Sequence, residues 1–252
     1  YKYGDNLNTI LYDFRNIDFN NLFKKFNSLI TNNTIIIAYD IGATIANLCI
    51  NQLNDNTKNM IEKLLLIAPT IGGIPLTIKD YFGNPFIEKY TSILLSLPNN
   101  EFYKNPIIIY NNLKYYSDNI KDLLKETNKL DKLYNDIVEI QKLSFKNPEI
   151  ETIIISNNQY ETPVCYNFEN NLNNEPIKYL PKHNNKNTDS DIHGEEIYGY
   201  QGFGDGVVPF ETILKLHNKW KDNSKIEIIK DKDHFTILKS YELMLIILAN
   251  IV

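Results

Sequence analysis

The sequence predicts an α/β fold with a mostly parallel sheet and helices on both faces. Unbroken runs rich in Ile and Leu occur at residues 34–38, 63–68 and 150–156, and such runs are typical of strands buried inside a parallel sheet. Segments with apolar residues at helical spacing separate these runs, and strands that alternate with helices indicate a parallel α/β sheet. The length of 252 residues suits one substantial core with room for a small cap.

Composition excludes several classes of partner and site. The net charge of −5 and the isoelectric point near 5.5 argue against nucleic acid binding, because a phosphate backbone requires a basic protein face. No apolar run reaches the length of about eighteen residues that spans a bilayer. Two cysteines, Cys49 and Cys165, are too few for a disulfide scaffold, and neither has metal-ligating neighbours at a useful spacing. We therefore expect neither a metal site nor a cofactor.

The first unit predicted along the chain consists of a strand, a helix and a second strand. A short apolar run at residues 9–12 is followed by the amphipathic stretch 20–29, in which Leu22 and Phe26 share one helical face. This stretch leads into the apolar run at 34–38. A β-α-β unit of this kind implies parallel strands.

The run at 34–38 ends in a tight turn that begins a helix. Ala38, Tyr39, Asp40, Ile41 and Gly42 occupy the frame of the Gly-x-Ser-x-Gly nucleophile elbow of α/β-hydrolases. Small residues flank the nucleophile in that motif, because its backbone is strained and the helix packs closely against the strand. The sequence keeps the shape of the elbow, but an aspartate stands where the motif has serine.

The middle of the chain predicts an insertion over the sheet. The strand at 63–68 leads into the glycine-containing loop 70–75, at the carboxyl end of a strand, where open sheets place their ligands. Residues 81–148 then show few strand signals. This interruption is too long for a plain crossover, so we expect it to form a helical cap. The segments expected within it are helices at 90–97 and 123–143 and a short strand at 107–110.

The rest of the chain returns to the core, which we expect to comprise residues 1–80 and 149–252. Residues 164–168 alternate like an exposed strand. Residues 169–196 are rich in Asn, Lys and Asp and predict a polar, mobile insert. The apolar segment 241–252 predicts a buried terminal helix.

Two further motifs follow the elbow in the chain order of α/β-hydrolase triads. Glycines flank Asp205 within residues 204–209, and His234 follows the strand predicted at 225–229. Nucleophile, acid and histidine occur in this order in α/β-hydrolases. Asp40, Asp205 and His234 are therefore the candidate catalytic residues.

These motifs together carry a resemblance to a known family. Residues 12–15 (Tyr-Asp-Phe-Arg), the elbow at Asp40, residues 71–75 (Ile-Gly-Gly-Ile-Pro), residues 204–209 and the Asp-His pair ending at His234 occur in the order and spacing of lecithin:cholesterol acyltransferase-like proteins. That family includes lysosomal phospholipase and phospholipid:diacylglycerol acyltransferases. The resemblance covers nearly the whole chain apart from the polar insert. It implies an α/β-hydrolase fold whose active members cleave a phospholipid acyl ester and pass the acyl group to water, a sterol or another alcohol.

The resemblance also implies roles by motif position. Asp205 would be the triad acid, His234 the triad base, and the backbone N–H of Ile41 one oxyanion donor. Tyr39 stands where many lipases carry histidine and is expected to pack beneath the cap. Arg15 is expected either to meet a phosphate headgroup or to form an internal ion pair with an acid of the cap.

The resemblance finally implies partners and a setting. Family members begin earlier, with a strand and with a loop that supplies a second oxyanion donor, so a removed segment or a partner chain is expected to complete the sheet. A phospholipid or another lipid is the expected ligand. Peripheral membrane contact and a secretory or membrane-associated location follow from the same resemblance.

Aspartate at the elbow changes the expected chemistry. In the serine version, histidine takes the hydroxyl proton and serine forms an acyl-enzyme. A carboxylate that attacked the ester would have to expel a much more basic alkoxide and leave a mixed anhydride. In addition, His234 between Asp40 and Asp205 would favour the imidazolium form, which cannot act as a base. We therefore expect a catalytically impaired member with a lipid-binding or protein-binding role.

Two active alternatives stay open at this stage. A phospholipid acyl hydrolase or acyltransferase would need another route, such as direct activation of water by His234. Alternatively, an aspartate on the same elbow is the nucleophile of haloalkane dehalogenases and epoxide hydrolases, in which it displaces a group at saturated carbon. The residues that flank Asp40 do not otherwise match those two families.

Overall fold

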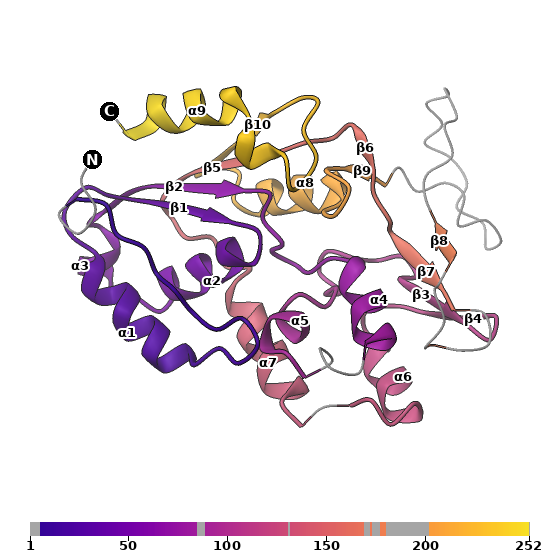
Figure 1. Cartoon of the computed structure of the whole chain (residues 1–252). Coiled ribbons are helices and arrows are strands. Elements are labelled where there is room, and N and C mark those ends of the chain that lie inside the picture. Colours follow the sequence, from indigo (N-terminus) through magenta and orange to yellow (C-terminus); the bar gives the residue numbers. More distant parts are fainter. Residues whose placement is uncertain are drawn as a thin grey trace.

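The chain is an α/β protein with a four-stranded, all-parallel sheet flanked by helices (Figure 1). The structure, a computed structural model, describes residues 6–84, 89–130, 132–168, 172, 177–179 and 202–251. The strands of the central sheet lie in the order β1 (Thr34–Tyr39), β2 (Ile61–Ile67), β5 (Glu151–Ser156) and β10 (Ser224–Ile228). The strands predicted at 34–38, 63–68, 150–156 and 225–229 thus form the central sheet, and the predicted parallel pairing is confirmed. The strand predicted at 9–12 was wrong, since these residues form neither a helix nor a strand and the run is too short to define one by its apolarity.

Side chains on the two faces of the sheet belong to two separate clusters. One face, here called the α9 face, carries Ile35, Tyr39, Leu65 and Ile153, which pack with helix α9 (Tyr241–Ile251). The opposite face contributes to the larger cluster. Helices on that side include α1 (Phe19–Leu29), α2 (Ile41–Ile50), α3 (Asp55–Lys58) and α8 (Phe210–Lys219). Because successive strand residues point to opposite faces, the unbroken apolar runs are explained by burial on both sides.

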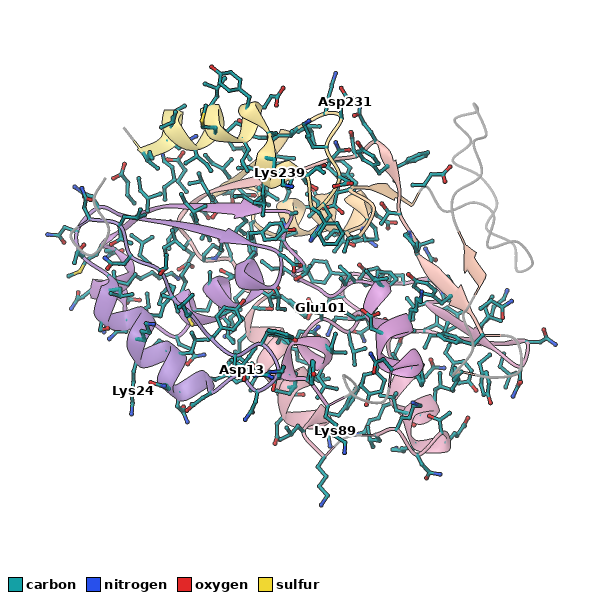
Figure 2. The ribbon with its side chains drawn as sticks, in the orientation of Figure 1. Asp13, Lys24, Lys89, Glu101, Asp231 and Lys239 are labelled. Atoms are coloured by element: carbon teal, nitrogen blue, oxygen red, sulfur yellow. The ribbon has the colours of Figure 1, made fainter. Side chains whose placement is uncertain are left out.

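The local sequence of helix α1 determines its buried face and its N-terminal cap. Leu22 and Phe26 are its buried residues and lie one turn apart on the face that meets the core. Asp18 caps the helix by accepting a hydrogen bond from the backbone N–H of Asn21 at 3.0 Å. Charged side chains such as Lys24 and Lys89 project away from the molecule (Figure 2).

The described residues between β2 and β5 form four helices and a hairpin. The helices are α4 (Leu76–Gly83), α5 (Thr91–Leu95), α6 (Ile120–Glu126) and α7 (Tyr134–Leu143), and the hairpin is β3 (Ile108–Tyr110) with β4 (Leu113–Tyr115). The helix expected at 90–97 and the strand expected at 107–110 are confirmed. The stretch 123–143 is two helices, because Asn128, at φ +56°, takes a left-handed conformation after α6. The division of the chain into core and cap stays a prediction.

A second sheet corrects one expectation. Its order is β4, β3, β7 (Cys165–Asn167) and β8 (Ile177–Tyr179), while β6 (Tyr160–Glu161) pairs separately with β9 (Phe203–Gly204). Residues 164–168 were expected to be an exposed strand, and this was wrong, since Cys165 and Tyr166 are fully buried. The reason is that β7 is an inner strand between β3 and β8.

The C-terminal helix α9 corrects another expectation. We expected a buried helix, but Leu243 is its buried residue, whereas Tyr241, Met244, Leu245 and Leu248 are exposed. One side of α9 packs on the sheet, preceded by the short 3-10 turn at Ile237–Lys239, and the other side faces outward. Among the described residues, no helix combines the length and apolarity needed to cross a bilayer. Most of the polar insert expected at 169–196 lies outside the described residues.

Candidate active site

The turn between β1 and α2 holds Asp40 in a strained backbone conformation. Its φ of +53° and ψ of −127° fall outside the regions that non-glycine residues normally adopt. The backbone N–H of Asp40 still donates to the carbonyl of Ile67 at 3.0 Å, and the carbonyl of Asp40 accepts from Ala43. Such strain costs about 1 to 3 kcal/mol and persists where the surrounding structure fixes it. The sharp turn leaves the Asp40 side chain 36% exposed.

The loop after β9 holds Asp205, whose side chain is fully buried. One carboxylate oxygen accepts hydrogen bonds from the backbone N–H groups of Val207 at 3.0 Å and Val208 at 2.7 Å. The other oxygen lies 2.9 Å from Nδ1 of His234. The next N–H of the loop, that of Gly206, donates to Oγ1 of Thr162 at 3.0 Å. A buried carboxylate held in this way is a fixed negative charge.

The glycine before Asp205 is required by close packing. A Cβ atom at Gly204 would lie 2.0 Å from the carbonyl oxygen of Val208 and 2.8 Å from Oγ1 of Thr162. No side chain fits there unless the backbone moves. The first glycine of the motif therefore has a direct steric cause, whereas Gly206 has a backbone φ of +93°, which favours glycine.

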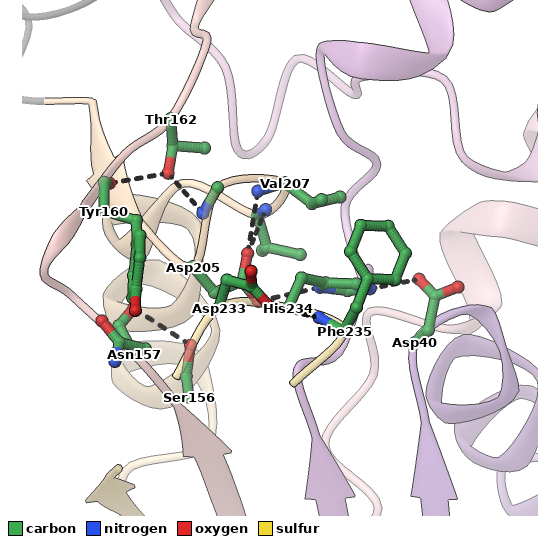
Figure 3. Close-up of polar contacts among 12 residues, drawn as sticks. Asp40, Ser156, Asn157, Tyr160, Thr162, Asp205, Val207, Asp233, His234 and Phe235 are labelled. Carbon is green, nitrogen blue, oxygen red and sulfur yellow. Dashed lines mark hydrogen bonds and ion pairs between the residues drawn. The ribbon is translucent and has the colours of Figure 1, made fainter. Parts of the chain in front are cut away.

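His234 joins the two acidic residues (Figure 3). The imidazole is 2% exposed, and its Nε2 lies 3.6 Å from Oδ1 of Asp40, which is an ion-pair distance. Two backbone contacts hold the residue as well. Its N–H donates to the carbonyl of Asp205 at 2.8 Å, and its carbonyl accepts from the hydroxyl of Tyr39 at 3.0 Å. The structure thus brings Asp40, His234 and Asp205 into one chain of contacts.

The electrostatics of His234 follow from this position. Burial on its own would lower the pKa of the imidazole, but the carboxylates of Asp205 and Asp40 outweigh burial and raise the pKa to about 9. At neutral pH the side chain is therefore an imidazolium between two acidic groups. Both of its ring nitrogens carry protons in that state.

The other predicted site residues occupy different positions. Tyr39 contacts the histidine loop, and burial together with nearby acidic groups, Asp40 first among them, raises the pKa of its phenol to about 12. Ile41 is the first residue of α2, where a backbone N–H has no acceptor within the helix. Arg15 lies on the loop before α1, exposed, and binds both carboxylate oxygens of Asp13 at 2.9 Å. Within the described residues, Arg15 makes no contact with the three charged groups, and its ion pair is not with the region expected to form a cap.

Several residues that shape the site had not been singled out from the sequence. Thr162 and the N–H groups of Val207 and Val208 position Asp205 and its loop. Asp233 stabilises the histidine turn, because its Oδ1 accepts from the N–H groups of Phe235 and Thr236. Of these residues, only Asp233 had a local sequence signal, since an aspartate three residues before a threonine is typical of such a turn.

Two cavities among the described residues lie away from Asp40. A cavity of about 30 Å³, room for about one water molecule, lies away from Asp40. Its lining residues include Phe102, Tyr103, Pro106, Ile107 and Lys215. A cleft of about 280 Å³ lies at the amino-terminal ends of β5 and β10, the end of the sheet opposite to Asp40. Among the described residues, no cluster of His, Cys, Asp and Glu is arranged to hold a metal ion.

Comparison with known proteins assigns no family. No family model matches the chain, and no curated protein is significantly similar to it.

Proposed function

We propose that the chain has an α/β-hydrolase fold of the lecithin:cholesterol acyltransferase-like type, in which residues 81–148 form a cap and an aspartate–histidine–aspartate set replaces the serine triad. The observation that carries the proposal is the geometry of Asp40. A positive φ at the junction of a parallel strand and a helix, with the side chain directed at a histidine, is what a nucleophile elbow requires. The histidine in turn contacts a buried acid at 2.9 Å.

In this proposal the set does not perform serine-type ester hydrolysis. A general base must accept a proton at Nε2 of His234, and an imidazolium has no free lone pair there. The pKa of about 9 keeps that proton in place at neutral pH. The side chain of Asp40 has no hydroxyl proton for a histidine base to remove. It is also a poor nucleophile toward an ester carbonyl, because the alkoxide that leaves the ester would be more basic than the attacking carboxylate.

The remaining role is binding of a lipid. An exposed apolar side chain lies beside the histidine: Phe235 is 68% exposed, with its ring centre 5.2 Å from that of His234. Leu238 and Tyr241 follow it along the chain and are also exposed. Exposed apolar groups gathered beside a charged site are typical of surfaces that bind amphiphiles. A phospholipid offers both an apolar chain and a polar headgroup to such a surface.

A fluorophosphonate probe, which labels activated serines, tests the proposal. The unaltered protein should remain unlabelled and should release no fatty acid from phosphatidylcholine vesicles. Asp40→Ser should become labelled, because serine lowers the negative charge around His234 and provides the missing hydroxyl. The double variant Asp40→Ser with His234→Gln is the matched control and should lose the label.

The outcomes separate the parts of the proposal. Rapid release of fatty acid by the unaltered protein would contradict the binding role. Failure of Asp40→Ser to react, in a protein whose circular dichroism is unchanged, would contradict the hydrolase-type elbow. Binding itself is measured by co-sedimentation with phosphatidylcholine vesicles, and Phe235→Asp should reduce it.

A second candidate function is supported by the exposure and strain of Asp40. Its carboxylate could displace a leaving group from saturated carbon and form an alkyl ester. Esterification would remove the charge of Asp40, so the pKa of His234 would fall and the imidazole could then activate water to release the alcohol. A single turnover with an epoxide or a bromoalkane in heavy-oxygen water should place the heavy oxygen in the carboxylate of Asp40. An unlabelled Asp40 peptide would exclude this reaction.

A further inference from the structure

Tyr12, on the segment before α1, lies beside the start of α2. Its hydroxyl oxygen is 3.7 Å from the place that a Cβ atom on Gly42, the second residue of α2, would take. Figure 1 shows the segment passing across α2. The ring of Tyr12 is partly buried and packs against the larger hydrophobic cluster. The hydroxyl is thus held next to the turn that carries Asp40.

The segment that carries Tyr12 is fixed by contacts with the start of α5. The carbonyl of Phe14 accepts a hydrogen bond from the N–H of Ser92 at 3.2 Å, and the carbonyl of Arg15 accepts one from the N–H of Thr91 at 3.0 Å. These bonds fix the backbone directly after Tyr12. A polar group on a fixed segment needs little reorganisation to meet a ligand.

The hydroxyl of Tyr12 is a hydrogen-bond donor with spare capacity. Within the parts of the chain that the structure describes, it makes no hydrogen bond. Other hydroxyls near the turn are already engaged. Tyr39 donates to the carbonyl of His234 at 3.0 Å, and the buried hydroxyls of Thr44 and Thr70 bond each other at 3.3 Å. The hydroxyl of Tyr12 is therefore the one that a ligand can use.

The phenol of Tyr12 keeps its proton beside Asp40. Burial, and after it the negative charge of Asp40, raise the pKa of the Tyr12 phenol above its ordinary value of 10. At neutral pH the residue therefore offers an O–H group. A ligand oxygen with a full negative charge would be repelled by Asp40, so the donor suits a neutral acceptor such as the carbonyl oxygen of an ester.

The start of α2 supplies a second donor in the same place. The backbone N–H of Ile41 lies in the first turn, where it has no acceptor within the helix. Gly42 follows without a side chain. Beyond its own helix and its chain neighbours, a Cβ on Gly42 would meet only the hydroxyl of Tyr12 among the described residues. The space beside the two donors is therefore free of side chains on the Gly42 side.

We propose that the hydroxyl of Tyr12 and the N–H of Ile41 together bind the carbonyl oxygen of an acyl ester at the Asp40 turn. This inference rests on the proposed function and adds to it a second hydrogen-bond donor, which α/β-hydrolases take from a separate loop. In the unaltered protein the two donors select ester-linked lipid chains over ether-linked chains, because an ether has no carbonyl oxygen. In Asp40→Ser, the same donors stabilise the negative charge that develops on the attacked group.

The rate at which the fluorophosphonate probe labels Asp40→Ser measures the contribution of Tyr12. In that reaction the serine oxygen bonds to phosphorus, fluoride leaves, His234 takes the serine proton, and charge develops on the phosphoryl oxygen. Adding Tyr12→Phe to Asp40→Ser should slow labelling about 10²-fold, as the loss of one oxyanion donor does. Tyr116→Phe, which removes a hydroxyl directly after β4, is the matched control and should leave the rate unchanged.

Gly42→Ala distinguishes loss of the binding space from loss of the fold. The new methyl group would lie 3.7 Å from the Tyr12 hydroxyl, an ordinary contact, and would crowd the place of the ester oxygen. Alanine also favours a helix more than glycine does. The melting temperature should therefore stay equal or rise, while labelling of Asp40→Ser slows about as much as with Tyr12→Phe.

Lipid binding by the unaltered protein is a second readout, which needs no serine. In isothermal titration calorimetry, a short-chain phosphatidylcholine with ester-linked chains should bind about tenfold more tightly than its ether-linked counterpart, a factor that one net hydrogen bond supplies. Tyr12→Phe should remove most of this preference and leave the affinity for the ether lipid unchanged. Tyr116→Phe should keep the preference.

The outcomes separate this inference from the proposed function. Equal labelling rates with and without the Tyr12 hydroxyl, or equal affinities of the unaltered protein for the two lipids, would overturn the role of Tyr12 while the proposed function stands. Absence of label in Asp40→Ser would contradict the hydrolase-type elbow, and the lipid comparison would then decide on Tyr12. Absence of binding to either lipid would overturn the lipid-binding role and this inference with it.

Discussion

His234 and Asp205 are joined twice. The Nδ1 of His234 lies 2.9 Å from Oδ2 of Asp205, and the backbone N–H of His234 donates to the Asp205 carbonyl at 2.8 Å. The side chain and the main chain of the histidine are therefore fixed by the same partner. The contact with Asp40, at 3.6 Å, is longer and is made by an exposed carboxylate. Asp205 determines where the imidazole sits, and Asp40 mainly adds charge.

The first prediction concerns stability against pH. The pKa of His234 is about 9 in the folded state against an ordinary value of 6.5, so the folded state binds the proton more tightly. The tighter proton binding stabilises the folded state, and this stabilisation is fully present below pH 6.5 and is lost as the pH rises through 9. It amounts to about 3 kcal/mol of unfolding free energy. Urea unfolding at a series of pH values measures it.

Because other groups titrate in the same range, the comparison with His234→Gln isolates the effect. The stability advantage of the unaltered protein over the variant should shrink by about 3 kcal/mol between pH 6.5 and pH 9. Parallel stability curves for the two proteins would show that His234 is not a stabilising cation.

The second prediction separates the two acids. Asp40→Asn removes a charge at similar volume and should lower the pKa of His234 by about 1 unit. Asp205→Asn should lower it further, because the shorter contact is lost while burial, which disfavours the cation, remains. Titration of the His234 ring by NMR gives both values. An unchanged pKa in Asp40→Asn would mean that the 3.6 Å ion pair does not operate in solution.

The third prediction concerns the glycine before the acid. Gly204→Ala places a Cβ 2.0 Å from the carbonyl oxygen of Val208 and should cost about 3 kcal/mol of unfolding free energy. The matched control is Gly83→Ala at the end of α4, where a Cβ meets nothing within 4 Å. The control should be neutral or slightly stabilising, since alanine restricts the unfolded chain. Equal thermal stability of the two variants would contradict the packing argument.

The fourth prediction concerns a buried amide that links α7 to α5. The Nε2 of Gln141 donates to the carbonyls of Leu95 and Leu97 at 2.8 Å, and its Oε1 accepts from Asn99 at 3.0 Å. Gln141→Leu leaves these buried groups unpaired and should cost about 3 kcal/mol. Thermal unfolding measures the loss.

A surface variant on the same helix is the control for Gln141. Lys142→Gln breaks an exposed ion pair with Glu139, and its effect should stay below about 0.5 kcal/mol. A similar loss in both variants would indicate that α7 as a whole is marginal and that the amide has no special role.

Much of the fold was predictable because its signals are local. Three strands of the central sheet, β1, β2 and β5, are apolar runs, and Asp205 follows Gly204, where packing leaves no room for a side chain. The turn at Asp40 was recognisable from the small residues beside it. The proximity of Asp40 and His234 was predictable because each follows a strand of the same parallel sheet, and such strands end at the same edge. Asp205 follows β9, outside that sheet, and its place beside His234 was expected only from the chain order of hydrolase triads.

The features that escaped prediction depend on contacts between distant segments. Helix α9 is apolar on nearly every side, a pattern typical of a buried helix, and the sequence does not reveal that the sheet covers only one of its sides. Likewise, the alternation at 164–168 predicted exposure, but pairing with β3 and β8 buries Cys165 and Tyr166. The hydroxyl of Tyr39 reaches a carbonyl 195 residues away.

The double attachment of His234 to Asp205 has a consequence for the history of such a protein. Neither hydrogen bond involves residue 40, and the Tyr39 hydroxyl adds a third contact from the neighbouring position. Mutation could therefore exchange the amino acid at position 40 over generations while the loops around it keep their shape. A lineage that abandoned one reaction here would still inherit the scaffold on which another could arise.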